Sequence, residues 1–455
     1  MLALLLIACH SNGSIQPPAT DDSPEPVVHD DSPEQVPGDS TPEEHHLPVL
    51  IIDTDGVPVN SSYKIDGTIA VITRHDGTLT DLDDARRDYS GPIGVEIHGT
   101  SSSGYPKLSL SFELRDDAGE DLDVDLLDLG SDSDWVLAAS YGDKTYVRNA
   151  LGYSLGRELA AGRRWEAEPR FVEVIFNRAY NGIYTLTGRA QRDKERIDIA
   201  KPAASEAEGD ITGGYIVRLE CGRDAGWTTN RGSVLSYSDP QSDQITSDQS
   251  QYLQHYFNQF ETMLSRNDFG ENYPDWIDTD AWIDHILVQE LAHNIDGLRL
   301  STPIYKHADP DGGLLVAGPL WDFDRAFGNV NYCYCYQEDG WIQDSLTTCG
   351  YGYQFASWWS RLREDPAFQD RMRCRWEELR QGIFADEALD ARVMAMIDEL
   401  REAEPRDQAV WHTIGLTVDF NYYVGQTWQD EIDYLLNWLH GRAAWMDGNV
   451  PGTCQ

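Results

Sequence analysis

Short runs of Val, Ile and Leu dominate the chain between residues 47 and 187 and predict a β-rich first half. In residues 108–114 apolar and polar side chains alternate strictly, as in a strand with one buried face. Two later runs are joined by a polar segment that contains Asn181-Gly182, a favoured pair for a hairpin turn. Residues 148–159 have helical spacing instead. The predicted strands are residues 47–52, 68–73, 94–98, 108–114, 171–176 and 183–187.

The apolar spacing changes in the second half, where hydrophobic residues recur every three or four positions, as in helices. One segment there, residues 302–324, has the pattern of a hairpin. A β-rich front and a mostly helical back indicate an α+β protein. We expect two lobes, a β-rich one over residues 47–210 and a helical one over residues 211–455. The predicted helices of the second half are residues 250–266, 279–293 and several between Asp365 and Met446.

The first nine residues have the pattern of a bacterial lipoprotein signal. Residues 2–8 form an apolar run that is too short to span a bilayer, and it ends in Leu6-Ile7-Ala8-Cys9. In that pattern the Cys becomes lipidated and N-terminal after processing. We therefore expect residues 1–9 to be a signal segment, with the lipid on Cys9 as the only contact with a membrane. The alternative is a chance Leu-rich start followed by a free Cys.

Export would place the protein in the bacterial cell envelope, outside the cytoplasm. His10 is not the Asp that serves some bacteria as an inner-membrane retention signal, which favours the outer membrane. Residues 10–46 form a linker, because seven of the 21 prolines lie between Pro17 and Pro42 and the segment contains no Lys or Arg. Such a segment is too polar and too charged to fold, so it should remain a disordered, extended tether.

The charge balance is strongly acidic, with 35 Lys and Arg against 78 Asp and Glu, a formal net charge of −43. A field of this sign repels nucleic acid, which we exclude as a partner, and it attracts divalent cations and basic polypeptides. The ordinary alternative is a solvated, salt-tolerant surface. With 40% hydrophobic residues, including 14 Trp and 22 Tyr, the chain can still bury a large core. Nothing in the sequence indicates an oligomeric state.

Six cysteines follow Cys9, and in an oxidising compartment an even number predicts disulfides. Six cysteines allow fifteen connectivities, which the sequence does not distinguish. Cys333-Tyr334-Cys335 lacks the C-x-x-C spacing of zinc and redox motifs, so we expect structural staples, several of them on a loop at about residues 330–350. The six are Cys221, Cys333, Cys335, Cys349, Cys374 and Cys454.

A pair of carboxylates, Asp322 and Asp324, lies in the segment Trp321-Asp322-Phe323-Asp324, shortly after the β-like run 314–316. Residues two apart at the end of a strand point to the same side, so both carboxylates could reach one cation. Carboxylate oxygens, with water and substrate phosphates, are the ligands that Mg²⁺ prefers. We therefore predict a metal site at Asp322 and Asp324. A turn or a solvated sheet edge is the ordinary alternative for such a pair.

A third carboxylate, Asp296, lies in the turn His293-Asn294-Ile295-Asp296-Gly297 at the end of a predicted helix. Loops that a rigid scaffold holds in place often carry catalytic groups, which makes Asp296 a candidate catalytic base. The ordinary alternative is a helix-terminal turn in which Asp296 only bonds to its own backbone.

A Gly- and Ser-rich loop, residues 98–107, lies between two predicted strands of the first half. Its small side chains expose backbone amides, and Lys107 at its end could reach a phosphate. The loop is not a P-loop, because the sequence G-K-[ST] is absent. Taken alone, it is a weak indication of a nucleotide site.

Together these segments resemble the CotH-type atypical protein kinases, a family first known from spore-coat proteins. The resemblance runs from residue 47 to about residue 440. No single segment is decisive, but six in the order of the family are specific. The matching segments are G-x-S-S-x-G-x-P-K (99–107), R-N-x-L (148–151), F-V-E-V…N-G-x-Y (171–184), G-G-Y (213–215), N-x-D (294–296) and W-D-F-D…F-G-N (321–329).

The resemblance implies a kinase-like fold with ATP between the lobes and transfer of its γ-phosphate to Ser or Thr of a protein. The acidic charge of the chain would favour a basic acceptor. The resemblance also implies Mg²⁺, with Mn²⁺ as an alternative, held by Asp322 and Asp324. Asp296 would orient the acceptor hydroxyl or take its proton. The residues expected to contact the nucleotide are Lys107, Arg148, Ser101, Ser102, Ser103 and Gly104, and pairing with a carboxylate is the alternative for Arg148.

Two positions depart from the family pattern. Many relatives carry Glu where this chain has Gly188, and a second Lys where it has Leu108. These departures leave two alternatives to a kinase open. One is a non-catalytic envelope protein that keeps the scaffold for binding, and the other is a metal-dependent phosphohydrolase or a different transferase.

Overall fold

The computed structural model describes residues 44–73, 80–81, 87–99, 102–220, 226–352 and 355–454. The predicted signal segment with Cys9, residues 10–43 of the linker, Ser101 and Cys221 lie outside these residues. The described chain begins with strand β1 (Glu44–His45), which pairs with β4 (Thr80–Asp81). No helix within the described residues is both long enough and apolar enough to cross a membrane.

Seven strands from the first half of the chain form a closed barrel. The parallel pairing of β2 with β10 closes it, and the other neighbours are antiparallel. All six strands predicted in the first half lie in this barrel, and β9 is an additional one. The order is β10 (Arg170–Phe176), β11 (Ala179–Gly188), β9 (Asp134–Ala139), β6 (Leu110–Leu114), β5 (Tyr89–Ile97), β3 (Ile65–Ile72) and β2 (Val49–Asp53).

Strand β6 is buried on both faces, although its alternating sequence predicted one solvated face. Its apolar residues, such as Phe112, fill the barrel, while the polar residues beside and within it are buried and hydrogen-bonded. The Ser109 hydroxyl accepts the Ala139 N–H at 2.9 Å, and the Ser111 hydroxyl donates to Glu96 at 3.2 Å. Small hydroxyl side chains that find partners can therefore occupy positions that the alternation assigned to solvent.

The predicted hairpin of β10 and β11 is present, but its turn lies four residues earlier than predicted. Asn177 and Arg178 form the turn, both with positive φ (48° and 71°), as a two-residue hairpin loop requires. Gly182 lies within β11 at a bulge. Its φ is 97°, and a Cβ there would approach Asp407 Oδ2 to 2.1 Å, so glycine is required by the backbone conformation at the bulge and by a close contact, not by the turn.

A five-stranded sheet in the second half shows that this part is less helical than predicted. The predicted hairpin at 302–324 is confirmed as β15 and β16, and β12, β13 and β14 are strands that the pattern did not reveal. The strand order is β13 (Trp227–Thr228), β14 (Val234–Asp239), β12 (Tyr215–Leu219), β15 (Thr302–Lys306) and β16 (Leu315–Ala317).

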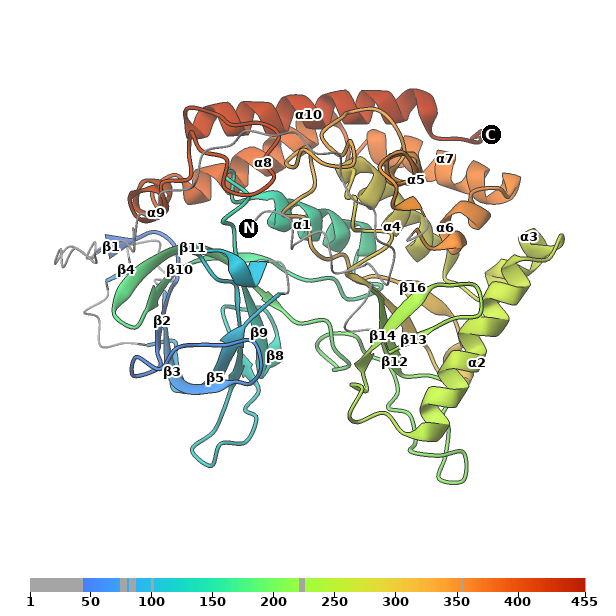
Figure 1. Cartoon of the computed structure of the whole chain (residues 1–455), viewed down its shortest axis with the longest axis horizontal. Helices are drawn as coiled ribbons and strands as arrows, with labels where there is room; N and C mark the ends of the chain where they lie inside the picture. The colour runs from blue at the N-terminus through green and yellow to red at the C-terminus, as the bar shows by residue number, and fades with distance from the viewer. Residues whose placement is uncertain are drawn as a thin grey trace, which may run out of the picture.

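Most helices form one layer above the barrel and the five-stranded sheet, which lie side by side beneath it (Figure 1). The predicted helices at 148–159, 250–266 and 279–293 are confirmed as α1, α2 and α4. Helix α4 contacts α1, α7, α10 and β16, and it is buried on nearly all sides. The longer helices are α1 (Arg148–Ala160), α2 (Ser247–Leu264), α4 (Thr279–Ala292), α7 (Pro366–Arg380), α8 (Asp386–Leu400), α9 (Glu404–Trp411) and α10 (Trp428–Asn449).

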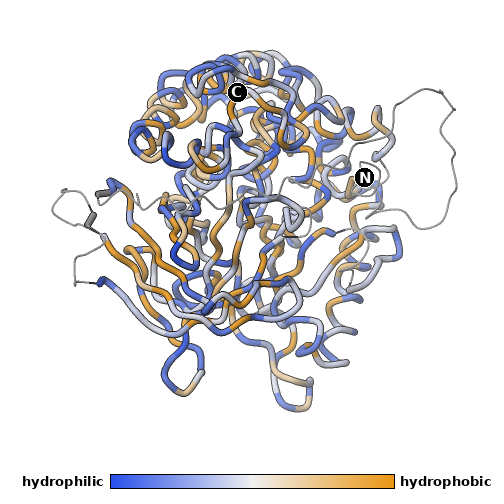
Figure 2. The backbone as a smooth tube through the Cα atoms, turned by 60° about the vertical axis from the view of Figure 1, so that its left-hand side comes forward, coloured by the Kyte–Doolittle hydropathy of each residue, from blue (hydrophilic) through white to orange (hydrophobic). Residues whose placement is uncertain are grey.

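Short helices and strands connect the barrel, the sheet and the helical layer. The hydropathy of the chain differs between the strands and the loops. Figure 2 shows apolar stretches along the barrel strands, whereas the loops that project from the molecule are hydrophilic. The α+β class predicted from the sequence is thus confirmed. The short elements are β7 (Val124–Asp125), β8 (Ser131–Asp132), α3 (Phe269–Asn272), α5 (Ile342–Thr348), α6 (Ser357–Leu362) and the 3₁₀ turns Ser102–Gly104, Tyr273–Asp275 and Asp309–Asp311.

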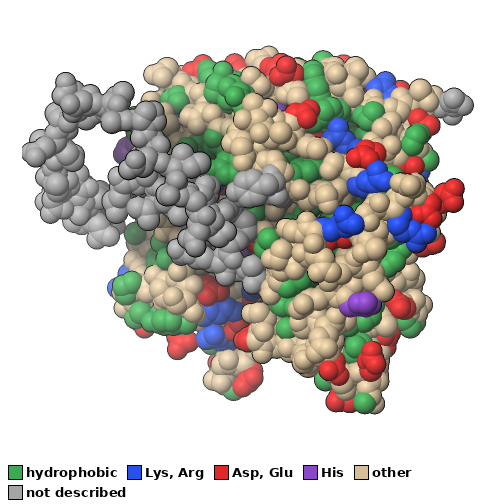
Figure 3. All heavy atoms as spheres, turned by 45° about the vertical axis from the view of Figure 1, so that its right-hand side comes forward, with side chains coloured by type: hydrophobic (Ala, Val, Ile, Leu, Met, Phe, Trp, Pro, Cys, Tyr) green, Lys and Arg blue, Asp and Glu red, His purple; other side chains and the backbone are tan. Residues whose placement is uncertain are grey.

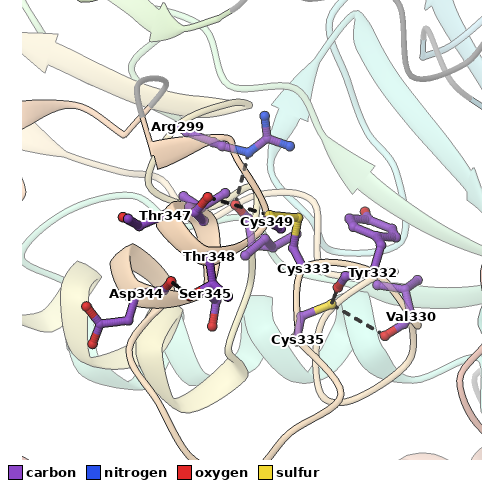
Figure 4. Close-up of a disulfide and its surroundings, with 12 residues drawn as sticks. Arg299, Val330, Tyr332, Cys333, Cys335, Asp344, Ser345, Thr347, Thr348 and Cys349 are labelled. Carbon is purple, nitrogen blue, oxygen red and sulfur yellow. Dashed lines mark hydrogen bonds between the residues drawn. A yellow bond between two sulfur atoms is a disulfide. The ribbon is translucent and has the colours of Figure 1, made fainter. Parts of the chain in front are cut away.

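Two disulfides confirm most of the cysteine prediction. Cys333 pairs with Cys349 within the predicted loop, and Cys374 of α7 pairs with Cys454 near the C-terminus. The prediction that Cys335 is also a staple is wrong, because it is a buried free thiol. Its Sγ lies 2.9 Å from the Tyr332 carbonyl and 3.4 Å from the Val330 carbonyl, so the thiol is satisfied by the backbone (Figure 4).

Helix α9 is fastened to the barrel by two buried ion pairs. Asp407 pairs with Lys107 and also accepts the Ile183 N–H at 2.7 Å. One residue earlier, Arg406 binds both oxygens of Glu173 at 2.9 and 2.7 Å. Lys107 and Asp407 are 1% and 2% exposed, so neither charge is stabilised by water, and each depends on the other.

We predict that Asp407→Ala lowers the free energy of unfolding by about 3–5 kcal/mol, because it leaves the Lys107 ammonium buried and unpaired. Urea denaturation measures this change. The matched control is Asp398→Ala, whose carboxylate pairs with Arg401 but is 66% exposed and should change stability by about 0.5 kcal/mol or less. Equal losses in the two variants would contradict the role assigned to the buried pair.

Candidate active site

The segment Trp321–Asp324 is fixed by α1 and by the turn after α4. The Phe323 N–H donates to Asn149 Oδ1 at 2.6 Å, and Asn294 Nδ2 donates to the Asp322 carbonyl at 2.9 Å. Asp322 has φ 67°, an unusual conformation for a non-glycine residue. The segment is a loop beyond the end of β16, so it is not the strand end assumed in the sequence analysis. Side-chain hydrogen bonds, and not a strand, hold its two carboxylates.

Phe323 anchors this loop in the core. Its ring is fully buried and lies edge-on to Tyr153 with a centroid distance of 6.2 Å. A Cβ on Gly152 would come within 2.4 Å of the ring, so the α1 glycine provides the space that Phe323 fills. The family-like R-N-x-L segment at the start of α1 therefore positions the acidic loop through Asn149, a role that the sequence analysis missed although the motif was noticed.

Asp322 and Asp324 form a strongly coupled pair of carboxyl groups. Burial raises the pKa of Asp324 to about 8, with a further rise from the charge of Asp322. Burial also raises the pKa of Asp322, and the nearby charge of Asp296 adds to that rise. A hydrogen bond joins the two side chains, so at neutral pH the pair holds a proton between them.

Asp296 lies beside this pair on the turn that follows α4. Its Oδ1 is 2.6 Å from Nη2 of Arg299, and the Arg299 guanidinium stacks on Tyr351 at 5.6 Å. The side chain of Asp296 is 15% exposed and thus remains accessible. The structure therefore brings together the three acidic residues predicted from the sequence. Arg299 holds the orientation of the third.

The Gly- and Ser-rich loop is linked to the acidic segment through Arg325. Arg325 Nη2 donates to the Tyr105 hydroxyl at 2.7 Å, and its Nε lies 3.1 Å from Asp419. Ser103 and Gly104 are exposed on this loop, and Ser102 is half-buried. Arg325 and Asp419 were not predicted: Arg325 directly follows the acidic motif, but Asp419 lies in a stretch without any local pattern.

The two predicted basic contacts are engaged elsewhere. Lys107 forms the buried pair with Asp407 and lies over the Tyr184 ring at 5.1 Å. Arg148 lies 2.5 Å from Asp143, whose other oxygen accepts the Arg148 N–H at 2.9 Å. Asp407, which no local pattern indicated, thus determines where the Lys107 ammonium points.

Of the two departures from the family pattern, the one at position 188 has a visible consequence for a neighbouring side chain. A Cβ on Gly188 would lie 2.9 Å from the Arg196 guanidinium carbon, so Arg196 fills the space over this position. At the second position, the Leu108 carbonyl accepts the Tyr184 hydroxyl at 3.0 Å. A longer side chain at position 188 would have to displace Arg196.

The donor set fits a hard divalent cation bound mainly by substrate and water. Within the described residues, no group of three or more His, Cys, Asp or Glu side chains is arranged to hold a metal by itself. Mg²⁺ is commonly bound by one or two carboxylates plus phosphate oxygens and waters. Asp322 and Asp324 supply two such carboxylates. Burial and neighbouring negative charge raise the pKa of both groups, and a bound cation would offset that charge.

Comparison with known proteins agrees with these segments. The model of the family described as CotH kinase protein matches residues 95–446, most of the chain. This match confirms the resemblance inferred from the motifs. A search of curated proteins finds no match.

We predict a pH-dependent stability that Asp324→Asn removes. Because the pKa of Asp324 is raised above its unfolded value, the protonated pair stabilises the metal-free protein fully below about pH 4, and this contribution is lost as the pH rises through about 8. The melting temperature of Asp324→Asn minus that of wild type should therefore be a few degrees larger at about pH 9 than at about pH 5. Thermal melts in EDTA measure this difference, and an equal difference at both pH values would contradict it.

Proposed function

The chain belongs to the CotH kinase protein family, and we propose that it transfers the γ-phosphate of ATP to Ser or Thr hydroxyls of proteins. The observation that carries the proposal is the arrangement of Asp322 and Asp324 beside Asp296, three carboxylates around one loop. Phosphoryl transfer requires positioning and charge neutralisation more than covalent catalysis, and this arrangement supplies acidic groups for both.

Each acidic residue has a distinct role in this proposal. Asp322 and Asp324 hold Mg²⁺ or Mn²⁺, which when bound neutralises phosphate charge. Asp296 orients the acceptor hydroxyl and takes its proton, while Arg299 keeps the carboxylate in place. Ser102, Ser103 and Gly104 cover the nucleotide, held near the acidic loop by the Tyr105–Arg325 contact. Asn149 acts through Phe323 and is a positioning residue.

We infer that the barrel serves as the N-terminal lobe of a kinase-like fold, and that the five-stranded sheet and the helices serve as the C-terminal lobe. The support is that candidate residues come from both parts: the Gly- and Ser-rich loop joins barrel strands β5 and β6, whereas the acidic residues follow α4 and β16. The boundary near residue 210 lies between β11 and β12, where the barrel ends and the sheet begins.

The protein is proposed to act outside the cytoplasm, anchored to the outer membrane through Cys9, with the linker as a tether. The predicted end of the linker at residue 46 is too late, because Glu44 and His45 form strand β1 and His45 is buried against Glu173. The net charge of −43 favours basic acceptor proteins and excludes nucleic acid as a partner. A non-catalytic binding protein is the second candidate, and one observation favours it. Lys107 is sequestered by Asp407, so a contact with phosphate would require that pair to open.

We predict that Asp322→Ala and Asp296→Ala separate binding from transfer. Asp322→Ala should lose both the thermal shift caused by Mg-ATP and the transfer of labelled phosphate to a Ser-containing basic peptide. Asp296→Ala should keep the thermal shift but lose transfer by about a hundredfold or more, as expected for loss of a general base. Asp311→Ala, an exposed carboxylate on a turn, is the control and should match wild type.

Three results would count against the kinase. Nucleotide binding without any transfer by the wild type would support the non-catalytic candidate. Release of inorganic phosphate without an acceptor would support a phosphohydrolase. Unchanged transfer by Asp322→Ala would remove the metal role of the acidic loop.

We predict that Asn149→Ala weakens Mn²⁺ binding about tenfold, because groups that position metal ligands commonly contribute tenfold to a hundredfold. The variant removes the acceptor of the Phe323 N–H and so loosens the loop that carries Asp322 and Asp324. Electron paramagnetic resonance of free Mn²⁺ measures the affinity. Ser154→Ala on the same helix is the control, and equal affinities in the two variants would contradict the positioning role.

A further inference from the structure

A cavity of about 440 Å³ lies apart from the acidic loop and is lined by an unusual number of cations. It is bordered by the C-terminal end of α1, the following residues 162–166, residues 194–198, and Tyr305 and His307 at the end of β15. None of Asp296, Asp322 and Asp324 lines it. Its five basic residues are Arg157, Arg163, Arg164, Lys194 and Arg196.

The local charge is opposite to that of the protein as a whole. The chain carries −43 overall, yet residues 157–201 contain ten Lys and Arg against seven Asp and Glu. Only Glu166 and Asp198 are acidic among the residues that line the cavity. On the face that Figure 3 shows, blue Lys and Arg side chains likewise occur in a few separate groups among the red ones. A basic cavity in an acidic protein concentrates anions locally.

Two of the four guanidinium groups are held rigidly. Arg196 is 3% exposed and lies 3.0 Å from Asp132, and it donates to the Asp134 and Arg189 carbonyls at 2.8 Å each. Arg164 donates to Glu166 at 3.3 Å and to Asp284 at 3.2 Å. Its remaining nitrogen, Nη1, has no bonded partner within the described part of the chain. A preorganised donor of this kind binds an anion at little entropic cost.

The other three cations lie at the rim and retain binding capacity. Lys194 is exposed and pairs with no acidic residue among those described. Arg163 is 57% exposed, and the 3.9 Å between its Nη2 and Asp284 Oδ2 is too long for a hydrogen bond. Arg157 is 46% exposed beside Glu168. Lys194 can turn toward a ligand without losing an ion pair to a described residue. Arg163 would have to release its bonds to the Leu159 and Ala160 carbonyls (3.1 and 3.3 Å), and Arg157 its pair with Glu168 at 2.7 Å.

The acidic group inside the cavity offers little repulsion. Glu166 accepts the Leu320 N–H at 2.7 Å in addition to the contact with Arg164, and burial raises the pKa of this carboxyl group. The walls also include the half-buried Trp165 and the buried Tyr305, which give flat apolar surface beside the charges. Charge, volume and aromatic surface together fit a small phosphate compound.

The cavity depends on a residue at which this chain departs from its family. Gly188 has no side chain, and the Arg196 guanidinium lies in the space that a side chain would occupy. A Glu at that position would displace Arg196 or neutralise it. The absence of a side chain at position 188 therefore leaves the space in which the Arg196 guanidinium lies.

We propose that this cavity binds a small phosphate-bearing anion at a site separate from the acidic loop. Arg164 and Arg196 form its fixed wall, and Arg163 and Lys194 close over the ligand from the rim. The ligand carries one or two phosphate groups, either as inorganic phosphate or pyrophosphate or on a nucleoside. Binding needs no divalent metal, because the cations are supplied by the protein.

Isothermal titration calorimetry with pyrophosphate, on the full-length protein in EDTA, tests the proposal. The Arg163→Glu/Lys194→Glu variant should bind pyrophosphate at least about tenfold more weakly than wild type. The control is Arg178→Glu/Lys201→Glu, which makes the same charge change at two exposed positions outside the cavity and should keep wild-type affinity. Asp322→Asn should also keep it, so failure of the kinase proposal leaves this result unaffected.

The outcomes distinguish the sources and can overturn the proposal. Tighter binding of AMP than of pyrophosphate would support a nucleotide that stacks on Trp165 or Tyr305, and the reverse order would support an inorganic ligand. The proposal is overturned if wild type shows no saturable binding of phosphate, pyrophosphate or AMP at millimolar concentrations. It is also overturned if the rim variant binds as tightly as the control.

Discussion

The constraint on which the site depends is the electrostatic repulsion of acidic groups held together out of water. Burial raises the pKa of both Asp322 and Asp324; the charge of Asp322 adds to the rise at Asp324, and the charge of Asp296 adds to the rise at Asp322. Three acidic side chains in such proximity would move apart unless the surrounding structure held them in place. Here the fixing contacts come from three distant segments: Asn149 on α1, Asn294 after α4, and Arg325 with its partner Asp419.

Buried charge is also the means by which the parts of the molecule are joined. The barrel is connected to α9 through Lys107–Asp407 and through the Arg406–Glu173 pair. Glu173 in addition lies 2.5 Å from His45. Pairs of this kind contribute little net stability compared with apolar packing, but each member is costly to leave alone. They therefore specify which surfaces meet, and the apolar core supplies the stability.

Sequence patterns predicted the elements better than the connections. Runs of Val and Ile located six barrel strands, and helical spacing located α1, α2 and α4, because these patterns follow from burial of one face. The turn at Asn177-Arg178 was missed because Asn181-Gly182 has the stronger turn preference, whereas Gly182 is needed for the approach of Asp407. The motifs located the three acidic residues. They did not locate Asp407 or Asp419, whose roles depend on contacts with residues 300 and 94 positions away in the sequence.

The buried Lys107–Asp407 ion pair between the barrel and α9 affects how the chain reaches its native state. Lys107 and Asp407 are separated by 300 residues, so the barrel cannot neutralise its buried ammonium until nearly the whole chain is present. Contacts of such long sequence separation form late and slow the overall rate. During synthesis, the first half would remain an incomplete intermediate, open to proteolysis until the C-terminal helices are made. The Lys107 ammonium therefore lacks its partner until the chain has been made as far as Asp407, and the same delay applies to Glu173 and its partner Arg406.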